Sequence, residues 1–520
     1  MVSQRDKPWV LTGTATPNAA ITACFNGKKT TSQADEAGVW AVELGVFPAN
    51  ASPAELVVTA ASGGEVDTVT IHDVVVGDVW LLSGQSNMQL WLSRTAHNFP
   101  DVMDKSDNLL RIIDIPQEVK LDGPRLPLEM DPASWKAFNP KTAPDFSAVG
   151  YFFGSKLRER YDVPIGLIAT AVGGTPIASW LSRDELDKLG VDCSETDKYA
   201  DNAGANQLLK SEQKATDKYQ KAMDKADLGL SENWAAPNYD DSGWETAKLT
   251  DFAPGAGVHW YRKTLAVPPT LACREAQIYL GTAIDRDTVY INGEPIGTTY
   301  YAYPPRVYSF TMPKGSITIA IRLITYGNGG EFAPGKNHFI GTDNGTLSLD
   351  GPWKRRVGVI VDKAPPQTRF FNYATSLYNG MIAPLRGTQI KGVAWYQGES
   401  DAGNPDVYGA KLKTLITSWR ELFADTKLPF LIQQLAHWDH TGPGGSDAQH
   451  HRNWETLRNQ QKTALDLPNV GLAAGYDVGE WNDLHPQGKR IVGERLARLA
   501  TRIAYHESLP PNMFEQYTLG

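Results

Sequence analysis

The fold of this chain is decided by the stretch Val74-Val75-Val76-Gly77-Asp78-Val79-Trp80-Leu81-Leu82-Ser83-Gly84-Gln85-Ser86-Asn87. Its apolar part has the length and composition of a buried strand. Gly84 permits a tight turn that would raise the Ser86 hydroxyl to the carboxyl edge of a sheet. An α/β hydrolytic fold presents its nucleophile in this way, although an ordinary strand-to-loop turn would leave the same pattern. Ser86 is therefore the predicted nucleophile.

A base for this serine is offered near the other end of the chain, in Asp483-Leu484-His485-Pro486. A serine becomes a nucleophile when a base takes its proton, and the base needs an acceptor that orients it. We therefore expect His485 to be the general base and Asp483, or a neighbour, to orient it. Taken alone, His485 could equally be a surface residue, and Asp483 could cap the helix that follows.

The pattern of short runs predicts an α/β domain with two β-rich partners. Residues 1–75 show alternating runs and the hairpin signal Asn26-Gly27, typical of a small β-sandwich. Residues 76–228 and 356–520 alternate strand-like runs with helical ones, which indicates an α/β fold. Residues 229–355 are again β-rich. The sequence thus predicts one α/β domain interrupted by a β domain, which disturbs the host little when the ends of the insert lie close together.

Two further segments follow strand-like runs and could stabilise an oxyanion. Gly173-Gly174 would let a main-chain N–H approach the developing charge without a side chain in the way. The side-chain amide of Gln397, in Gln397-Gly398-Glu399, could donate another hydrogen bond. The alternatives are a simple glycine turn and a solvated loop. The joint placement of these segments at strand ends favours a common site.

Composition and charge exclude several classes of partner. The 520 residues carry a net charge of −9 and no long basic stretch, so a surface that follows nucleic-acid phosphates is not expected. No apolar run is long enough to cross a bilayer. The cysteines are few and far apart, which predicts neither a disulfide framework nor a metal site. The first residues lack the apolar core of a signal peptide, which predicts a cytoplasmic protein unless a leader is missing.

The motifs together resemble those of the sialate O-acetylesterase-like carbohydrate esterases of the SGNH hydrolase superfamily. The matching segments, spread over nearly the whole chain, are Val76-Gly77-Asp78-Val79-Trp80, Gly84-Gln85-Ser86-Asn87-Met88, Gly173-Gly174-Thr175-Pro176-Ile177 with Trp180, Trp395-Tyr396-Gln397-Gly398-Glu399-Ser400, and His485-Pro486 with Lys489. The resemblance implies an SGNH-type (flavodoxin-like) three-layer α/β/α domain with a galactose-binding-like jelly-roll insert. Met1 matches an internal methionine of the family's first motif, so a missing leader would make the protein periplasmic or secreted.

The resemblance also implies roles for the site residues. The serine motif supplies the nucleophile, Ser86, whose N–H joins that of Gly173 (or of Gly174) in the oxyanion hole. Gln397 takes the place of the third donor, usually an Asn. No metal or cofactor is implied.

The last motif departs from the family pattern, which usually reads Asp-x-x-His. Asn482 stands three residues before His485, and the nearest acid is Asp483. An Asn cannot supply a negative charge to an imidazolium. Either Asp483 does so as the third member of the triad, or the site works as a Ser–His pair with a carbonyl or another acid as partner. Glu399 and Asp477 are weaker alternatives.

The implied activity is that of a serine esterase removing O-acetyl groups from sugars, with sialate and plant-wall glycans such as xylan or xyloglucan as possible substrates. Tentative sugar contacts are Asn87, Trp180, Glu399 and Trp481, with Arg94 and Trp438 beside them, although each aromatic could instead belong to the core. One rival is a glycoside hydrolase, which needs two opposed carboxylates. The other is a non-catalytic carbohydrate-binding protein on the same scaffold, suggested by the departure at Asn482. The oligomeric state is not predicted.

Overall fold

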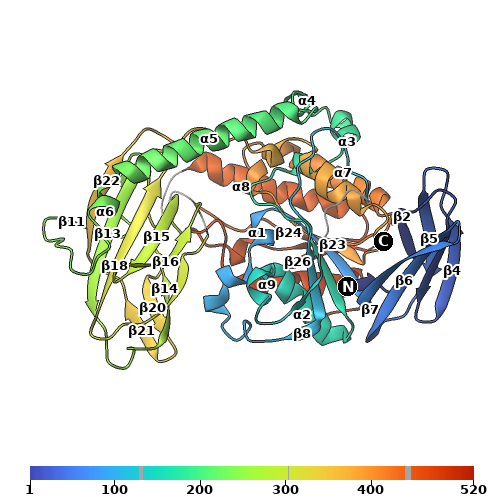
Figure 1. Ribbon diagram of the computed structural model, residues 1–520, viewed down its shortest axis with the longest axis horizontal. Helices are drawn as coiled ribbons and strands as arrows, with labels where there is room; N and C mark the ends of the chain where they lie inside the picture. The colour runs from blue at the N-terminus through green and yellow to red at the C-terminus, as the bar shows by residue number, and fades with distance from the viewer. Residues whose placement is uncertain (128–132, 303, 440–446, 520) are drawn as a thin grey trace.

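A computed structural model describes residues 1–127, 133–302, 304–439 and 447–519. Figure 1 shows three bodies in a row, with a mixed α/β body between two β-rich ones. The blue N-terminal strands lie at one end and the green and yellow strands of the insert at the other. No helix among the described residues is both long enough and apolar enough to span a membrane.

The central body is built on a sheet of mostly parallel strands. In spatial order these are β26 (Glu515–Thr518), β25 (Val470–Ala473), β24 (Phe430–Gln433), β23 (Gly392–Tyr396), β7 (Glu65–Gly84), β10 (Ile165–Ala169), β8 (Asp107–Asp114) and β9 (Lys136–Phe138). The outermost strands β26 and β9 pair antiparallel, and all the inner pairs are parallel.

The strand order contains one strand more than the flavodoxin-like order. Numbered along the chain, the six parallel strands run 2-3-1-4-5-6 across the sheet. Without β8, which lies outside β10, the other five run 2-1-3-4-5, which is the flavodoxin-like order. The third strand, β10, rather than the second, β8, lies beside β7. Strand neighbours come from long-range pairing, which the local sequence pattern does not specify.

Helices cover both faces of this sheet, as the apolar run of β7 requires. Side chains alternate between the faces of a strand, so Val79 and Leu81 face one core and Trp80 and Leu82 the other. The first core is closed by α7 (Tyr408–Leu422) and α8 (Ala448–Lys462). The second is closed by α2 (Ala148–Tyr161) and α9 (Lys489–Ile503). The body is therefore a three-layer α/β/α arrangement.

The N-terminal β body shares its longest strand with the central one. Its strands are β1 (Val2–Gln4), β2 (Trp9–Thr14), β3 (Ala20–Phe25), β4 (Lys28–Gln33), β5 (Val39–Gly45), β6 (Asn50–Ser62) and the first half of β7. The predicted boundary at residue 75 falls within β7, which pairs with β6 at one end and with β10 and β23 at the other. One continuous strand thus leads from the N-terminal β body into the central sheet.

The insert consists mainly of two antiparallel sheets around a core of its own. One contains β11 (Glu245–Ala247), β22 (Trp353–Ile360), β13 (Gly257–Ala266), β18 (Ser316–Thr325), β15 (Arg286–Ile291) and β16 (Glu294–Thr299); the other contains β17 (Val307–Thr311), β14 (Glu275–Tyr279), β20 (Phe339–Thr342) and β21 (Gly345–Ser348). A short pair, β12 (Ala253–Pro254) and β19 (Gly329–Gly330), completes it. Because β22 ends at Ile360, the insert extends past the predicted boundary at residue 355.

Helices lead from the central body to the insert. They are α3 (Arg183–Lys188), α4 (Ser194–Asp197), the long α5 (Ala203–Ala226) and α6 (Leu228–Ser231); α5 bridges the two bodies in Figure 1. Its far end is fixed by Arg322 of the insert, whose Nε lies 2.7 Å from Asp227 and whose Nη2 lies 2.6 Å from Asp224. Asp227 is fully buried and also accepts the Trp260 indole N–H at 3.0 Å. The buried Asp227 carboxylate is therefore paired with Arg322, and this ion pair fixes the insert to the helices that lead to it.

Substituting Gly84 tests the turn at the end of β7. Its φ is +129°, and a Cβ there would lie 2.1 Å from the carbonyl oxygen of Tyr396. We expect Gly84→Ala to lower the free energy of unfolding by about 2 kcal/mol or more, because strain and a clash act together. The measurement is chemical denaturation followed by tryptophan fluorescence. Gly403→Ala, with open space around it, is the control, and equal stability of the two variants would contradict the role given to this turn.

Candidate active site

The carboxyl ends of three adjacent parallel strands bring the predicted motifs together. Leu82 of β7 pairs with Ala169 of β10, and Gly84 pairs with Tyr396 of β23. The serine motif, the double glycine and the Gln397 segment follow directly after these positions. In open α/β sheets this edge is where ligands bind. The predicted meeting of the three segments at one sheet edge is therefore confirmed.

Ser86 is held at this edge by main-chain contacts. It begins the short helix α1 (Ser86–Gln89), directly after the Gly84 turn. The Gln85 N–H donates to the Tyr396 carbonyl at 2.9 Å. The Gln85 side-chain oxygen accepts the N–H groups of Gly398 and Ser400 at 3.3 Å each. Gln85 thus connects the serine motif to the Gln397 segment by hydrogen bonds.

Gly173 lies against the serine. A Cβ on Gly173 would sit 3.3 Å from the Ser86 Cβ and 3.7 Å from its Cα, so the absence of a side chain permits the close approach. The Gly173 N–H donates to the Gln89 side-chain oxygen at 2.9 Å. Gln89 is exposed, and its oxygen takes the kind of hydrogen bond that an oxyanion would take. The sequence reasoning missed Gln89, which lies three residues after the serine on α1.

The side-chain amide of Gln397 donates its hydrogen bonds within the protein. It is 0% exposed, and its Nε2 donates to the Thr175 carbonyl at 3.0 Å and to Asp401 Oδ2 at 2.6 Å. Asp401 also accepts the Ile177 N–H at 2.8 Å, and burial raises the pKa of its carboxyl. Both amide hydrogens of Gln397 are therefore in use. These hydrogen bonds connect the Gln397 segment to the segment that follows Gly173-Gly174. They do not support the expected donation from Gln397 to an oxyanion.

Asn87 links the serine to the histidine segment. It is 1% exposed, and its Nδ2 donates to Glu399 Oε1 at 2.5 Å and to the Leu484 carbonyl at 3.0 Å. Its Oδ1 accepts a hydrogen bond from Lys489 Nζ. Asn87, which follows Ser86, is thus directly hydrogen-bonded to Leu484, which precedes His485. Burial raises the pKa of Glu399 and lowers that of Lys489 to about 8.

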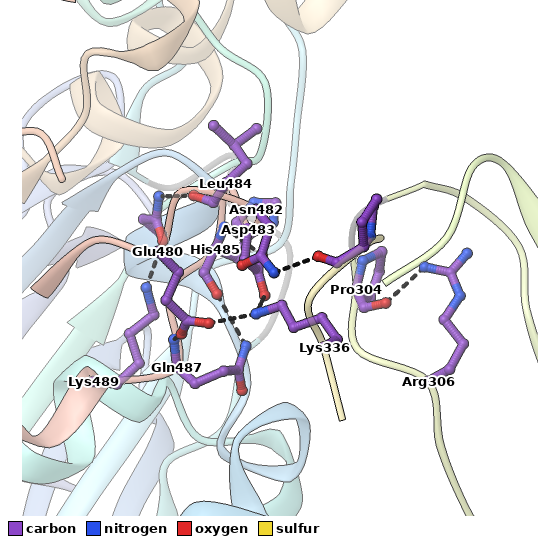
Figure 2. Close-up of polar contacts among 12 residues, drawn as sticks. Pro304, Arg306, Lys336, Glu480, Asn482, Asp483, Leu484, His485, Gln487 and Lys489 are labelled. Carbon is purple, nitrogen blue, oxygen red and sulfur yellow. Dashed lines mark hydrogen bonds and ion pairs between the residues drawn. The ribbon is translucent and has the colours of Figure 1, made fainter. Parts of the chain in front are cut away.

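His485 lies in a loop that Asp483 and the insert hold in place (Figure 2). The His485 main-chain N–H donates to Asp483 Oδ1 at 2.8 Å. Asp483 Oδ2 accepts from Lys336 Nζ at 3.0 Å, and Lys336 also contacts Glu480. Lys336 belongs to the insert, and sequence reasoning missed it because its partners are far away in the chain. Asp483 thus accepts a hydrogen bond from the main chain of His485.

Burial is the largest cause of the shifted pKa values of Asp483 and His485 in this loop. It raises the pKa of Asp483 to about 6, even though the charge of Lys336 acts in the opposite direction. Burial, with the charge of Lys489 second, lowers the pKa of His485 to about 3. The imidazole is therefore neutral at pH 7 and able to accept a proton. Asp483 is mostly ionised at that pH.

The two alternative acids are engaged elsewhere. Asp477 forms an ion pair with Arg495, with oxygen–nitrogen distances of 2.7 and 2.6 Å, and this contact lowers its pKa. Glu399 accepts from Asn87 as described above. Asn482, at the family's usual acid position, donates to the Pro334 carbonyl of the insert at 2.6 Å. The position that departs from the family pattern thus contacts the insert.

The expected sugar contacts separate into buried and half-buried residues. Trp180 is 0% exposed and packs in the core with Trp395, and Asn87 is equally enclosed. These positions do not support direct contact with a sugar. Trp481 is half-buried against Gly335 of the insert, and Arg94 donates to the Pro305 carbonyl at 3.4 Å. Over the described residues, no group of three or more His, Cys, Asp or Glu side chains is arranged to hold a metal ion.

Comparison with known proteins identifies the family. Residues 76–226 and 349–502 match the family "Carbohydrate esterase, sialic acid-specific acetylesterase", and the gap between the two matches contains the strands of the insert except β22. The mouse sialate O-acetylesterase is 32% identical over 96% of this chain and 70% of its own length. The human sialate O-acetylesterase is 31% identical over 35% of this chain and 37% of its own length.

A solved structure agrees with this assignment. The carbohydrate acetylesterase XAC1771 from Xanthomonas citri is 25% identical, with a TM-score of 0.58 over 98% of this chain and 74% of its own length. The family match covers more than half of the chain and includes every motif around Ser86 and His485. The chain therefore belongs to the sialic acid-specific acetylesterase family of carbohydrate esterases and is a carboxylic ester hydrolase.

Proposed function

We propose that this protein is a serine esterase that removes O-acetyl groups from sugars. The observation that carries the proposal is the approach of the Gly173 main chain to Ser86, together with the bond between Asn87 and the Leu484 carbonyl. It supports a site in which a main-chain N–H donor and the histidine segment lie beside one serine. Relatives named sialate O-acetylesterase and carbohydrate acetylesterase support acetylated sugars as the substrate class.

The reaction follows the acyl-transfer sequence of serine hydrolases. Ser86 Oγ attacks the acetyl carbonyl carbon while His485 accepts the hydroxyl proton. The N–H groups of Ser86 and Gly173 bind the oxyanion once the Gln89 side chain has moved away. The carbon–oxygen bond to the sugar then breaks, and His485 returns the proton to the leaving sugar hydroxyl. Water, activated by the same histidine, releases acetate from the acetyl-enzyme.

Asp483 and Gln397 take supporting roles in this mechanism. Asp483 holds the His485 loop through its main-chain N–H, and its negative charge favours the imidazolium that forms during proton transfer. Gln397 positions the Gly173 segment by donating to Thr175. We assign the oxyanion hole to main-chain donors, each of which contributes about 3 kcal/mol to transition-state stabilisation.

Replacing the nucleophile is the direct test of the proposal. We expect Ser86→Ala to lower kcat for p-nitrophenyl acetate and for acetylated sugars by about 10⁴-fold or more, because no other hydroxyl takes its place. Ser242→Ala, an exposed serine of the insert, is the matched control and should behave like wild type. Retained turnover in Ser86→Ala would contradict the esterase mechanism, and a non-catalytic sugar-binding role would then become the working hypothesis.

The two acids near His485 should differ in effect. Asp483→Ala removes the acceptor of the His485 N–H and leaves Lys336 without one of its partners. We expect kcat to fall by about 10²- to 10⁴-fold. Asp477→Ala breaks only the ion pair with Arg495 and should change kcat less than threefold, or about 0.6 kcal/mol. Steady-state kinetics on p-nitrophenyl acetate distinguishes them, and a larger loss in Asp477→Ala would transfer the acid role to that residue.

The pH profile tests the link between Asp483 and Lys336. Because the pKa of Asp483 is about 6, its carboxylate is lost as pH falls through that value, and kcat/KM should fall with it. The His485 pKa of about 3 lies too low to cause this limb. In Lys336→Met the pKa of Asp483 should rise further, since the cation that lowers it is gone, and the acid limb should move to higher pH. The exposed Lys314→Met is the control, and an unmoved limb in Lys336→Met would refute the coupling.

A further inference from the structure

A cavity of about 360 Å³ lies between the insert and the central body, beside the His485 loop. Tyr279, Lys336 and Phe339 line it from the insert, and His97, Asp483 and Gln487 line it from the hydrolase side. Resting on the proposed esterase function, we infer that this cavity binds an uncharged sugar ring of the substrate, adjacent to the reacting acetyl ester. Its size lies within the range of small-ligand sites.

The insert supplies an aromatic wall to this cavity. The rings of Tyr279 and Phe339 stack with centroids 4.4 Å apart and an interplanar angle of 23°. His97 approaches Tyr279 from the other body, with centroids 5.1 Å apart. Both Tyr279 and His97 are half-buried. A rigid aromatic surface with polar groups at its margin suits the apolar face and the hydroxyl rim of a pyranose ring.

Two polar atoms of the lining residues have capacity for a ligand. Gln487 is 9% exposed, and its Nε2 donates to the His485 carbonyl at 2.9 Å, which fixes the orientation of its amide. Its Oε1 and the Nδ1 of His97 are buried without a hydrogen-bond partner among the described residues. Buried polar atoms are normally paired, since leaving one unpaired destabilises the fold. Sugar hydroxyls, which both donate and accept, would satisfy the two atoms.

The charges around the cavity favour a neutral ring over a carboxylated one. Lys336 is shared by two acids, Glu480 and Asp483. The other lining cation, Arg306, is fully buried and paired with Asp287 at 2.7 Å. Both cations are thus compensated, and the group of Lys336 with its two acids has a net negative charge. A carboxylate placed here would face repulsion from Glu480 and Asp483.

The position of the cavity links ring binding to catalysis. Gln487 bonds to the His485 carbonyl, and Asp483 bonds to the His485 N–H. A sugar hydroxyl that is hydrogen-bonded to Gln487 is therefore linked to the proposed base, His485, through that one side chain. The insert would then contribute directly to substrate selection, because Tyr279 and Phe339 belong to it.

The experiment compares a sugar ester with an ester that has no sugar. Tyr279→Ala should raise KM for acetylated xylo-oligosaccharides at least tenfold more than it raises KM for p-nitrophenyl acetate. Tyr279→Phe, which keeps the ring, should stay within threefold of wild type on both. Tyr300→Ala, an exposed aromatic of the same insert, is the matched control and should change neither. Equal effects of Tyr279→Ala on the two substrates would overturn the inference.

Direct binding separates this inference from the esterase mechanism. In the Ser86→Ala variant of the 520-residue chain, ligand-observed NMR should detect binding of xylotetraose, and adding Tyr279→Ala should weaken this binding at least tenfold, whatever the catalytic outcome. N-acetylneuraminic acid should bind at least tenfold more weakly than xylotetraose at the Tyr279-dependent site. Tyr279-independent binding of xylotetraose would refute the site. Stronger Tyr279-dependent binding of N-acetylneuraminic acid would refute the preference for a neutral ring.

Discussion

The buried side chain of Asn87 is the interaction on which the site depends. It bonds to Glu399 after β23, to the Leu484 carbonyl before His485, and to Lys489 at the start of α9. Three distant parts of the chain thus meet at one amide beside Ser86. In a dry environment each of these hydrogen bonds is costly to leave unmade. The contacts of Asn87 hold the serine and histidine segments together, whereas the sequence suggested Asn87 as a tentative sugar contact.

The same principle extends to the insert. A module between α5 and the second half of the hydrolase could fold as an independent appendage. Here Lys336 bonds to Asp483 and Glu480, and Asn482 bonds to Pro334, so the loop that carries His485 is held from both bodies. The departure from the usual Asp at position 482 becomes intelligible in this context, because that side chain serves the interface. Asp483 compensates the charge of Lys336 and holds the histidine backbone at once.

Much of the local structure could be predicted from periodicity. The alternation of strands and helices predicted for residues 356–520 is found, for example in the strand Gly392–Tyr396 and the helix Tyr408–Leu422, because apolar spacing reports burial on one or both faces. The arrival of Ser86, Gly173 and Gln397 at one sheet edge also followed from strand ends. The strand order did not, since β10 rather than β8 lies beside β7. Pairing between distant strands depends on the whole core, which short windows of sequence do not contain.

The sequence by itself determined the elements, the split of the hydrolase by a β insert, the identity of the motif residues and, through its resemblance to a family, the class of chemistry. Only the tertiary structure decided what each side chain does. Gln397 donates its hydrogen bonds to Thr175 and Asp401, and Trp180 is buried in the core. Lys336 of the insert contacts Asp483 in the histidine loop. The physical reason is that motifs are local, whereas burial, hydrogen-bond partners and pKa depend on neighbours brought together by folding.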